Sequence, residues 1–176
     1  MSADAAAPRM LILGARDLSV TVAALAQTAG YEVLLADPRV TFDPSDAYST
    51  VARTLPGRPE AVLAGIALGP RDAVLVLTHD LELDVAALVP ALTGGAGYVG
   101  ALGSRRMTAR RAERLREAGL GEAEIAAIRA PCGLDVGAVT PEETAISIVA
   151  EVLAARQGRT GGSLRDAGGS IRPHDA

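Results

Sequence analysis

Two adjacent arginines, Arg105 and Arg106, follow an apolar run and the turn Gly103-Ser104 near the middle of the chain. They open a stretch that we predict to be helical. The positive end of a helix macrodipole disfavours a cation by roughly 0.3–1 kcal/mol, so the pair is poorly placed unless an anion joins it. A phosphate at a helix N-terminus would supply that anion. We therefore predict a cofactor-binding anion site at Gly103, Ser104, Arg105 and Arg106.

The same arginines also have a purely structural interpretation. Residues 105–117 hold six arginines and two glutamates, in a chain whose net charge is -4. Side chains three residues apart on a helix can pair, and the pairs here are Arg110–Glu113, Glu113–Arg116 and Arg114–Glu117. From Arg110 onward a solvated helix face is favoured, whereas for Arg105 and Arg106 both interpretations stay open.

Other polar residues follow the ends of predicted strands. In an open parallel α/β sheet, ligands bind beyond the carboxyl ends of the strands, near the point where the strand order reverses. We therefore expect these residues to line one shared pocket with the arginine turn. They are Arg16, Asp17, Asp37, His79 and Asp80, and Gly14 at the end of the first strand is a further cofactor-binding candidate.

The first strand–helix turn is an incomplete dinucleotide signature. A full Gly-x-Gly-x-x-Gly motif would have glycines at 14, 16 and 19, and the chain has Gly14, Arg16 and Ser19. The missing second glycine matters most, because it lets the backbone approach a pyrophosphate. The Arg16 side chain offers a phosphate contact of a different geometry. Asp37 is placed either to accept from ribose hydroxyls or to form an ordinary Asp-Pro turn.

His79 and Asp80 allow two interpretations, and no catalytic residue is assigned. In the first interpretation, they act on a ligand as acid, base or hydroxyl partner. In the second, Asp80 caps the next helix and His79 is a polar loop residue. Cys132 lies between a proline and a glycine in an apolar stretch, where a buried packing residue is favoured over a nucleophile. Since no His, Cys or carboxylate spacing fits a metal site, we expect no protein-ligated metal.

Composition narrows the class of protein. Apolar residues make up 49% of the 176 residues and aromatic residues only 2%, so the core must be aliphatic. An acidic chain with pI near 5.2 is not expected to bind nucleic acid generally. The first eight residues do not resemble a secretory signal, and no apolar run approaches the roughly 20 residues that span a bilayer. We expect a cytoplasmic protein without a membrane segment.

Alternating apolar runs and helical periods predict an α/β fold: a Rossmann-like, doubly wound, mainly parallel sheet with helices on both faces. Strand 10–13 should be central, between strands 32–36 and 73–77. The remaining expected strands are 49–53 and 98–102, and the expected helices are 18–29, 59–68, 84–92, 105–118, 122–128 and 141–158. We expect a flexible N-terminus (1–8), one domain (9–158) and a mobile tail (159–176).

Several motifs in order resemble the C-terminal, Rossmann-type domain of the XdhC/CoxI family, and the resemblance as a whole covers residues 9–164. The matching segments are Leu77-Thr78-His79-Asp80, 98–106 (Tyr-Val-Gly-Ala-Leu-Gly-Ser-Arg-Arg), 130–138 (Ala-Pro-Cys-Gly-Leu-Asp-Val-Gly-Ala), 140–145 (Thr-Pro-Glu-Glu-Thr-Ala) and 161–164 (Gly-Gly-Ser-Leu). Arg16 stands where the family has a small glycine-containing turn, and Cys132 where it tends to have an aliphatic residue. We expect a stand-alone Rossmann half without the family's N-terminal domain.

This resemblance implies an accessory protein for a molybdenum hydroxylase of the xanthine dehydrogenase or CO dehydrogenase type. Such a protein binds molybdenum cofactor (molybdopterin) or a related dinucleotide transiently and promotes its sulfuration or insertion. It is a chaperone-like factor rather than an enzyme. The implied partners are the client hydroxylase and a separate protein that supplies the N-terminal domain; a homodimer is left open. An anion site at Ser104, Arg105 and Arg106 would suit the phosphate of the ligand.

Two other classes of function remain as alternatives. One is a small NAD(P)-binding oxidoreductase, which the incomplete glycine signature and the lack of a substrate domain disfavour. The other is a regulatory interaction module that binds no ligand.

Overall fold

Five parallel strands form the centre of the molecule, in the order β3-β2-β1-β4-β5. The computed structural model describes residues 6–168. The strands are β1 (Arg9–Leu13), β2 (Glu32–Ala36), β3 (Arg53–Leu55), β4 (Ala73–Val76) and β5 (Tyr98–Ala101). The predicted central position of the first strand between the second and fourth is confirmed, and with it the Rossmann-like fold. The strand order reverses between β1 and β4.

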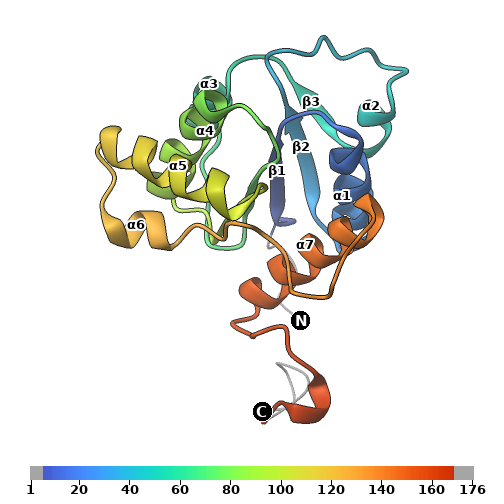
Figure 1. Cartoon of the computed structure of the whole chain (residues 1–176). Coiled ribbons are helices and arrows are strands. Elements are labelled where there is room, and N and C mark those ends of the chain that lie inside the picture. The colour runs from blue at the N-terminus through green and yellow to red at the C-terminus, as the bar shows by residue number, and fades with distance from the viewer. Residues whose placement is uncertain (1–5, 169–176) are drawn as a thin grey trace.

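Helices cover both faces of the sheet (Figure 1). Alternate strand residues point to opposite faces, and they divide the core into two clusters. One contains Met10 and Ile12 and packs against α1 (Asp17–Thr28) and α7 (Pro141–Arg156). The other contains Leu11 and Leu13 and packs against α3 (Pro59–Ala64), α4 (Leu81–Thr93) and α5 (Arg105–Glu117). Because both faces are covered, the strands are continuous apolar runs.

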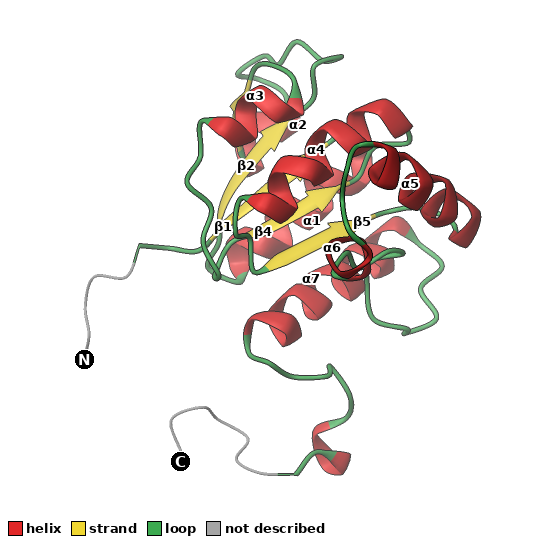
Figure 2. Ribbon diagram, turned by 90° about the vertical axis from the view of Figure 1, so that its left-hand side faces the viewer, coloured by secondary structure: helices red, strands yellow, loops and turns green. Residues whose placement is uncertain are grey.

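The common direction of the strands is visible in Figure 2, where β1, β2, β4 and β5 run side by side. In such a sheet all carboxyl ends meet at one edge. The loops that follow β1, β4 and β5 therefore emerge together, and these loops carry most of the residues predicted to bind a ligand.

Several element boundaries differ from the sequence-based prediction; α3, for example, ends at Ala64 and not at 68. Two of the differences have clear physical reasons. The third strand was expected at 49–53, but the β-branched residues there belong to the short helix α2 (Ala47–Val51), which starts at the Asp43–Asp46 turn. The fourth helix starts at Leu81 instead of 84, because the Asp80 carboxylate accepts hydrogen bonds from the N–H groups of Glu82 (3.0 Å) and Leu83 (3.2 Å).

Helix α7 begins as predicted. The Thr140 hydroxyl accepts from the Glu143 N–H (3.1 Å), while the Glu143 carboxylate accepts from the Thr140 N–H (3.0 Å). This capping box satisfies donors that the first helical turn would otherwise leave free. The remaining helix, α6 (Glu122–Ala126), ends two residues before the predicted boundary.

The predictions for the two ends of the chain fall partly outside the described residues. Residues 1–5 and 169–176 are not described, so the expected flexibility of 1–8 and mobility of 159–176 stay predictions. Residues 159–168 are exposed and include a short 3-10 helix, Leu164–Asp166. Across residues 6–168, every helix is too short or too polar to cross a membrane.

Candidate functional site

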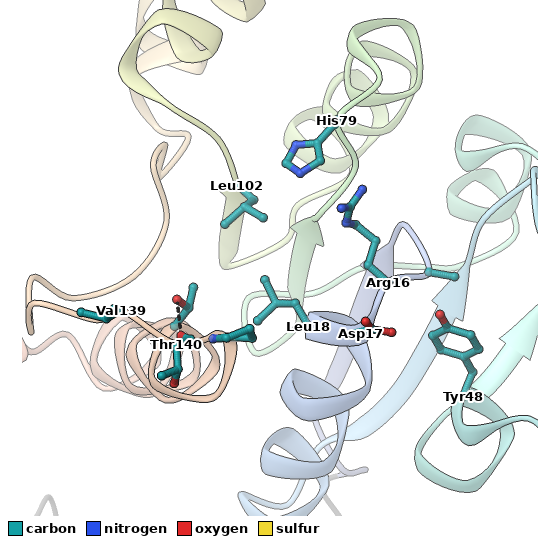
Figure 3. Close-up of a pocket in the computed structure, with 11 residues that line it drawn as sticks. Arg16, Asp17, Leu18, Tyr48, His79, Leu102, Val139 and Thr140 are labelled. Atoms are coloured by element: carbon teal, nitrogen blue, oxygen red, sulfur yellow. Dashed lines mark hydrogen bonds between the residues drawn. The ribbon is translucent and has the colours of Figure 1, made fainter.

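A pocket of about 690 Å³ opens beyond the carboxyl ends of β1 and β4, where the strand order reverses. Its size is typical of a small-molecule site. The starts of α1 and α7 form two of its walls (Figure 3). The lining residues are Ala15, Arg16, Asp17, Leu18, Tyr48, His79, Leu102, Val139, Thr140, Pro141 and Thr144.

Gly14 allows the loops after β1 and β4 to lie against each other. It has φ of +110°, a conformation that L side chains rarely adopt. A Cβ atom at this position would lie 3.0 Å from the Thr78 backbone nitrogen. The first glycine of the incomplete signature is therefore required by close packing of two loops, and this packing places Arg16 and His79 at one opening.

Arg16 and His79 project into that opening from opposite sides (Figure 3). Both residues are exposed. Arg16 is the N-cap residue of α1, which starts at Asp17, one residue before the predicted 18, and the Arg16 side chain makes no capping hydrogen bond. The first-turn N–H groups of α1 and the Arg16 guanidinium thus lie together, an arrangement suited to an anion.

Ser19 occupies the position of the third glycine in the dinucleotide signature. It is fully buried, and its hydroxyl donates a 2.6 Å hydrogen bond to the Gly14 carbonyl oxygen. This contact closes the turn between β1 and α1. The departure from the signature is therefore a different way of fixing the same loop.

Asp37 holds this loop from the end of β2. Its carboxylate accepts from the Ala15 N–H (2.9 Å) and from the backbone N–H, Nε and Nη2 of Arg39, and the residue is only 3% exposed. Burial raises the pKa of this carboxyl, but these hydrogen bonds outweigh the effect and hold the pKa below its ordinary value of 3.8. Since all four contacts occupy the carboxylate, a ribose hydroxyl would have to displace Arg39.

The structure separates the roles of His79 and Asp80. His79 lines the pocket, whereas the Asp80 carboxylate caps α4 through the N–H groups of Glu82 and Leu83. Helix capping, one of the two interpretations of this pair, thus accounts for Asp80. A ligand contact remains a prediction for His79.

The arginine turn lies beside the pocket and does not form its wall. Gly103 has φ of +136°, and the Ser104 hydroxyl caps α5 by accepting from the Met107 N–H (3.2 Å). Arg105 and Arg106 are exposed. The described residues that line the pocket include Leu102, but not Gly103, Ser104, Arg105 or Arg106. An anion site at these four residues stays a prediction.

Sequence reasoning missed the wall formed by residues 139–144 and Tyr48. The sequence predicted that this helix starts at 141, but nothing in the sequence showed that this start lies across the pocket from Arg16. Burial raises the pKa of the Tyr48 phenol, and the nearby Asp17 acts in the same direction. Tyr48 thus offers a protonated hydroxyl to the pocket.

Cys132 is buried, as predicted, and lies away from the pocket lining. Burial raises the pKa of its thiol to about 12, which disfavours the thiolate that a nucleophile needs. Within residues 6–168, no three His, Cys, Asp or Glu side chains are grouped so that they could hold a metal ion.

Comparison with known proteins identifies relatives of this domain. The chain is 31% identical over 150 residues to a Bacillus subtilis (strain 168) protein described as a probable subunit of xanthine dehydrogenase, covering 85% of this chain and 43% of that protein. It is 38% identical over 84 residues to the molybdenum cofactor insertion chaperone PaoD of Escherichia coli (strain K12), covering 48% and 26%.

A solved structure shares the fold. It is that of a xanthine dehydrogenase from Bacillus halodurans, with a TM-score of 0.72 and 25% identity, covering 86% of this chain and 45% of the other. The chain spans less than half the length of each of these relatives. Residues 10–152 match the XdhC Rossmann domain, and the chain therefore belongs to that family.

Proposed function

We propose that this chain is an accessory factor in the maturation of a molybdenum hydroxylase, and that it binds molybdenum cofactor or a related pterin nucleotide in the pocket beyond the carboxyl ends of β1 and β4. The pocket carries the proposal, because Arg16, His79 and the N-terminus of α1 surround one opening at the point where the strand order reverses. The names of the relatives support the ligand class, since one is a molybdenum cofactor insertion chaperone.

The residues that line the pocket suit both the phosphate and the pterin ring of such a ligand. A phosphate would contact the Arg16 guanidinium and the first-turn N–H groups of α1. The Asp17 carboxylate and the Tyr48 hydroxyl provide acceptors for the N–H groups of a pterin ring. The cofactor is cargo in this proposal, held by hydrogen bonds and charge and passed on to the client enzyme.

Arg105 and Arg106 are retained in the proposal as a second, outer contact for anionic groups. They follow Leu102, which does line the pocket, but the described lining does not require them. Variants at Arg16 and at Arg106 can therefore be compared directly.

A binding panel tests the proposal. The intact chain would be heated with molybdenum cofactor released anaerobically from a molybdoenzyme, with pyrophosphate, with NAD⁺ and with NADP⁺. A true ligand at 100 times its Kd stabilises the folded state by about 2.7 kcal/mol. We expect the cofactor and pyrophosphate to raise Tm, and we expect Arg16→Ala to remove most of the shift.

Other outcomes would favour the alternatives. Stabilisation by NAD⁺ or NADP⁺ but not by the cofactor would favour a small oxidoreductase. Stabilisation by none of the four would favour an interaction module and contradict the proposal.

A further inference from the structure

A buried ion pair lies behind the pocket wall that carries His79. Arg111 of α5 donates from Nη2 (2.7 Å) and Nε (3.0 Å) to one carboxylate oxygen of Asp84 in α4. The two side chains are 2% and 0% exposed. Neither residue is among the described residues that line the pocket.

On one side, the ion pair holds the residues that flank His79. The Thr78 hydroxyl donates to the second carboxylate oxygen of Asp84. The same hydroxyl oxygen accepts from the Asp80 N–H (3.1 Å). His79 thus lies between two residues whose positions depend on Asp84.

On the other side, the pair holds the loop after β5. Arg111 Nη2 donates a 2.8 Å hydrogen bond to the Leu102 carbonyl oxygen, and Leu102 lines the pocket. One ion pair therefore connects the two loops that form this wall, although it does not reach the pocket surface.

Stability alone is a poor explanation for these two residues. Replacing a buried ion pair by apolar side chains of similar volume is often neutral or stabilising. In addition, Arg111 Nη1 is buried and has no hydrogen-bond partner among the described residues, and a buried donor without a partner is unfavourable. A buried ion pair with this free-energy cost is expected to have a role that an apolar pair would not fulfil.

We propose that Asp84 and Arg111 are positioning residues of the pocket, which fix the His79 loop and the Leu102 backbone for ligand binding. They act through these neighbours and make no ligand contact. The ligand class rests on the proposed function, but the fixed position of His79 is a property of the free protein and can be measured separately.

A second Arg–Asp pair provides a matched control. Arg9, at the start of β1, donates to Asp72 over 2.6 Å, and their side chains are 29% and 7% exposed. This pair ties β1 to the turn before β4 at the amino edge of the sheet, opposite the pocket. Its replacement removes the same chemical groups without touching the pocket walls.

The experiment compares the paired substitutions D84L/R111M and R9M/D72L in the full chain. The chain has two histidines, so His174→Gln in all samples leaves His79 as the only imidazole in the NMR spectrum. We expect D84L/R111M to stay folded, its His79 signals to move toward those of free histidine, and its Kd for pyrophosphate to rise tenfold or more. In R9M/D72L the His79 signals should be unchanged and the Kd should stay within twofold.

Thr78 provides a second test that leaves both residues of the ion pair in place. Thr78→Val removes the hydroxyl that connects Asp84 to Asp80 and should shift the His79 signals and weaken pyrophosphate binding severalfold, whereas Thr78→Ser should restore both. If D84L/R111M does not fold, the Thr78→Val and Thr78→Ser variants decide whether these contacts position His79.

Unchanged His79 signals in folded D84L/R111M, or in Thr78→Val, would overturn the positioning role. If the unsubstituted chain binds no pyrophosphate, the proposed function loses support, while the His79 signals still decide whether the ion pair positions the loop.

Discussion

Helices α1 and α5 begin in similar ways but occupy different places relative to the pocket. Each follows a strand of the same sheet and a glycine with positive φ, Gly14 at +110° and Gly103 at +136°. Each starts with arginine, Arg16 at the N-cap of α1 and Arg105 at the first position of α5. Only Arg16 is among the described residues that line the pocket.

The order of the strands explains this difference. β1 lies at the centre, between β2 and β4, and the order reverses beside it, whereas β5 pairs with β4 at the edge of the sheet. A loop after the central strand therefore faces the crevice between two sets of loops. The position of a helix start in the sheet, more than its charge, therefore determines whether it faces this pocket.

The two helix starts are also held differently. In the loop before α1, the Ala15 N–H donates to the Asp37 carboxylate, and the Ser19 hydroxyl donates to the Gly14 carbonyl oxygen. The loop before α5 is held by residues of that helix itself: Arg111 Nη2 donates to the Leu102 carbonyl oxygen, and the Met107 N–H donates to the Ser104 hydroxyl. The first arrangement leaves the Arg16 guanidinium available to a ligand.

The largest effect is expected from alanine at the two glycines. A Cβ on Gly14 would meet the Thr78 backbone nitrogen at 3.0 Å, while one on Gly103 would meet the movable Met107 side chain at 3.2 Å. Strained positive-φ conformations cost about 1–3 kcal/mol, so we expect Gly14→Ala near the upper end and Gly103→Ala near the lower end. Urea unfolding measures both, and equal losses would show that the loop contact at Gly14 is unimportant.

Alanine substitutions at Arg16 and Arg106 should differ in how strongly they weaken ligand binding. A charge-assisted hydrogen bond contributes about 1.5–3 kcal/mol, so Arg16→Ala should weaken binding of molybdenum cofactor roughly tenfold or more. Arg106→Ala should have a smaller effect, because Arg106 lies outside the described pocket lining. Isothermal titration at fixed salt measures both, and a larger loss at Arg106 would move the anion site to α5.

The cap of α5 should affect stability without affecting the pocket. Ser104→Ala removes the acceptor for the Met107 N–H and should lower the free energy of unfolding by about 1 kcal/mol. Binding of pyrophosphate should stay within twofold. Ser104→Asp, which keeps a capping acceptor, serves as the control, and weaker binding by Ser104→Ala alone would bring this turn into the site.

The smallest effect concerns Asp37 and depends on pH. Because the pKa of its carboxyl is lowered in the folded protein, its ionised form contributes stability that is present above the unfolded value of 3.8 and is lost as the pH falls through the folded pKa. The difference in unfolding free energy between the native chain and Asp37→Asn should therefore be constant near neutral pH and shrink below pH 3.8. A difference that grows on acidification would mean that the pKa is raised.

Much of the fold could be predicted from the sequence, because strands buried on both faces are apolar runs and helix caps have local signatures. The capping box of Thr140 and Glu143 is such a signature. The boundary error at 49–53 arose because β-branched residues there form a helical turn that depends on the Asp43–Asp46 contacts. Local composition does not reveal such contacts.

The candidate site was less predictable, since it depends on which loops meet. Arg16 and His79 were correctly expected to follow neighbouring strands, and both line the pocket. The prediction of a solvated helix face from Arg110 onward was wrong at Arg111, which is buried against Asp84. The sequence did not reveal this, because the other arginines of α5 are exposed and Asp84 is 27 residues away.

The most direct test of the central claim is an NMR titration of the isotopically labelled chain with pyrophosphate, followed by molybdenum cofactor under anaerobic conditions. We expect the backbone amide signals of residues 15–18, 79 and 102 to shift first and most, with smaller shifts at 105 and 106. Shifts confined to the start of α5, or no shifts at residues 15–18, would contradict a ligand pocket beyond the carboxyl ends of β1 and β4.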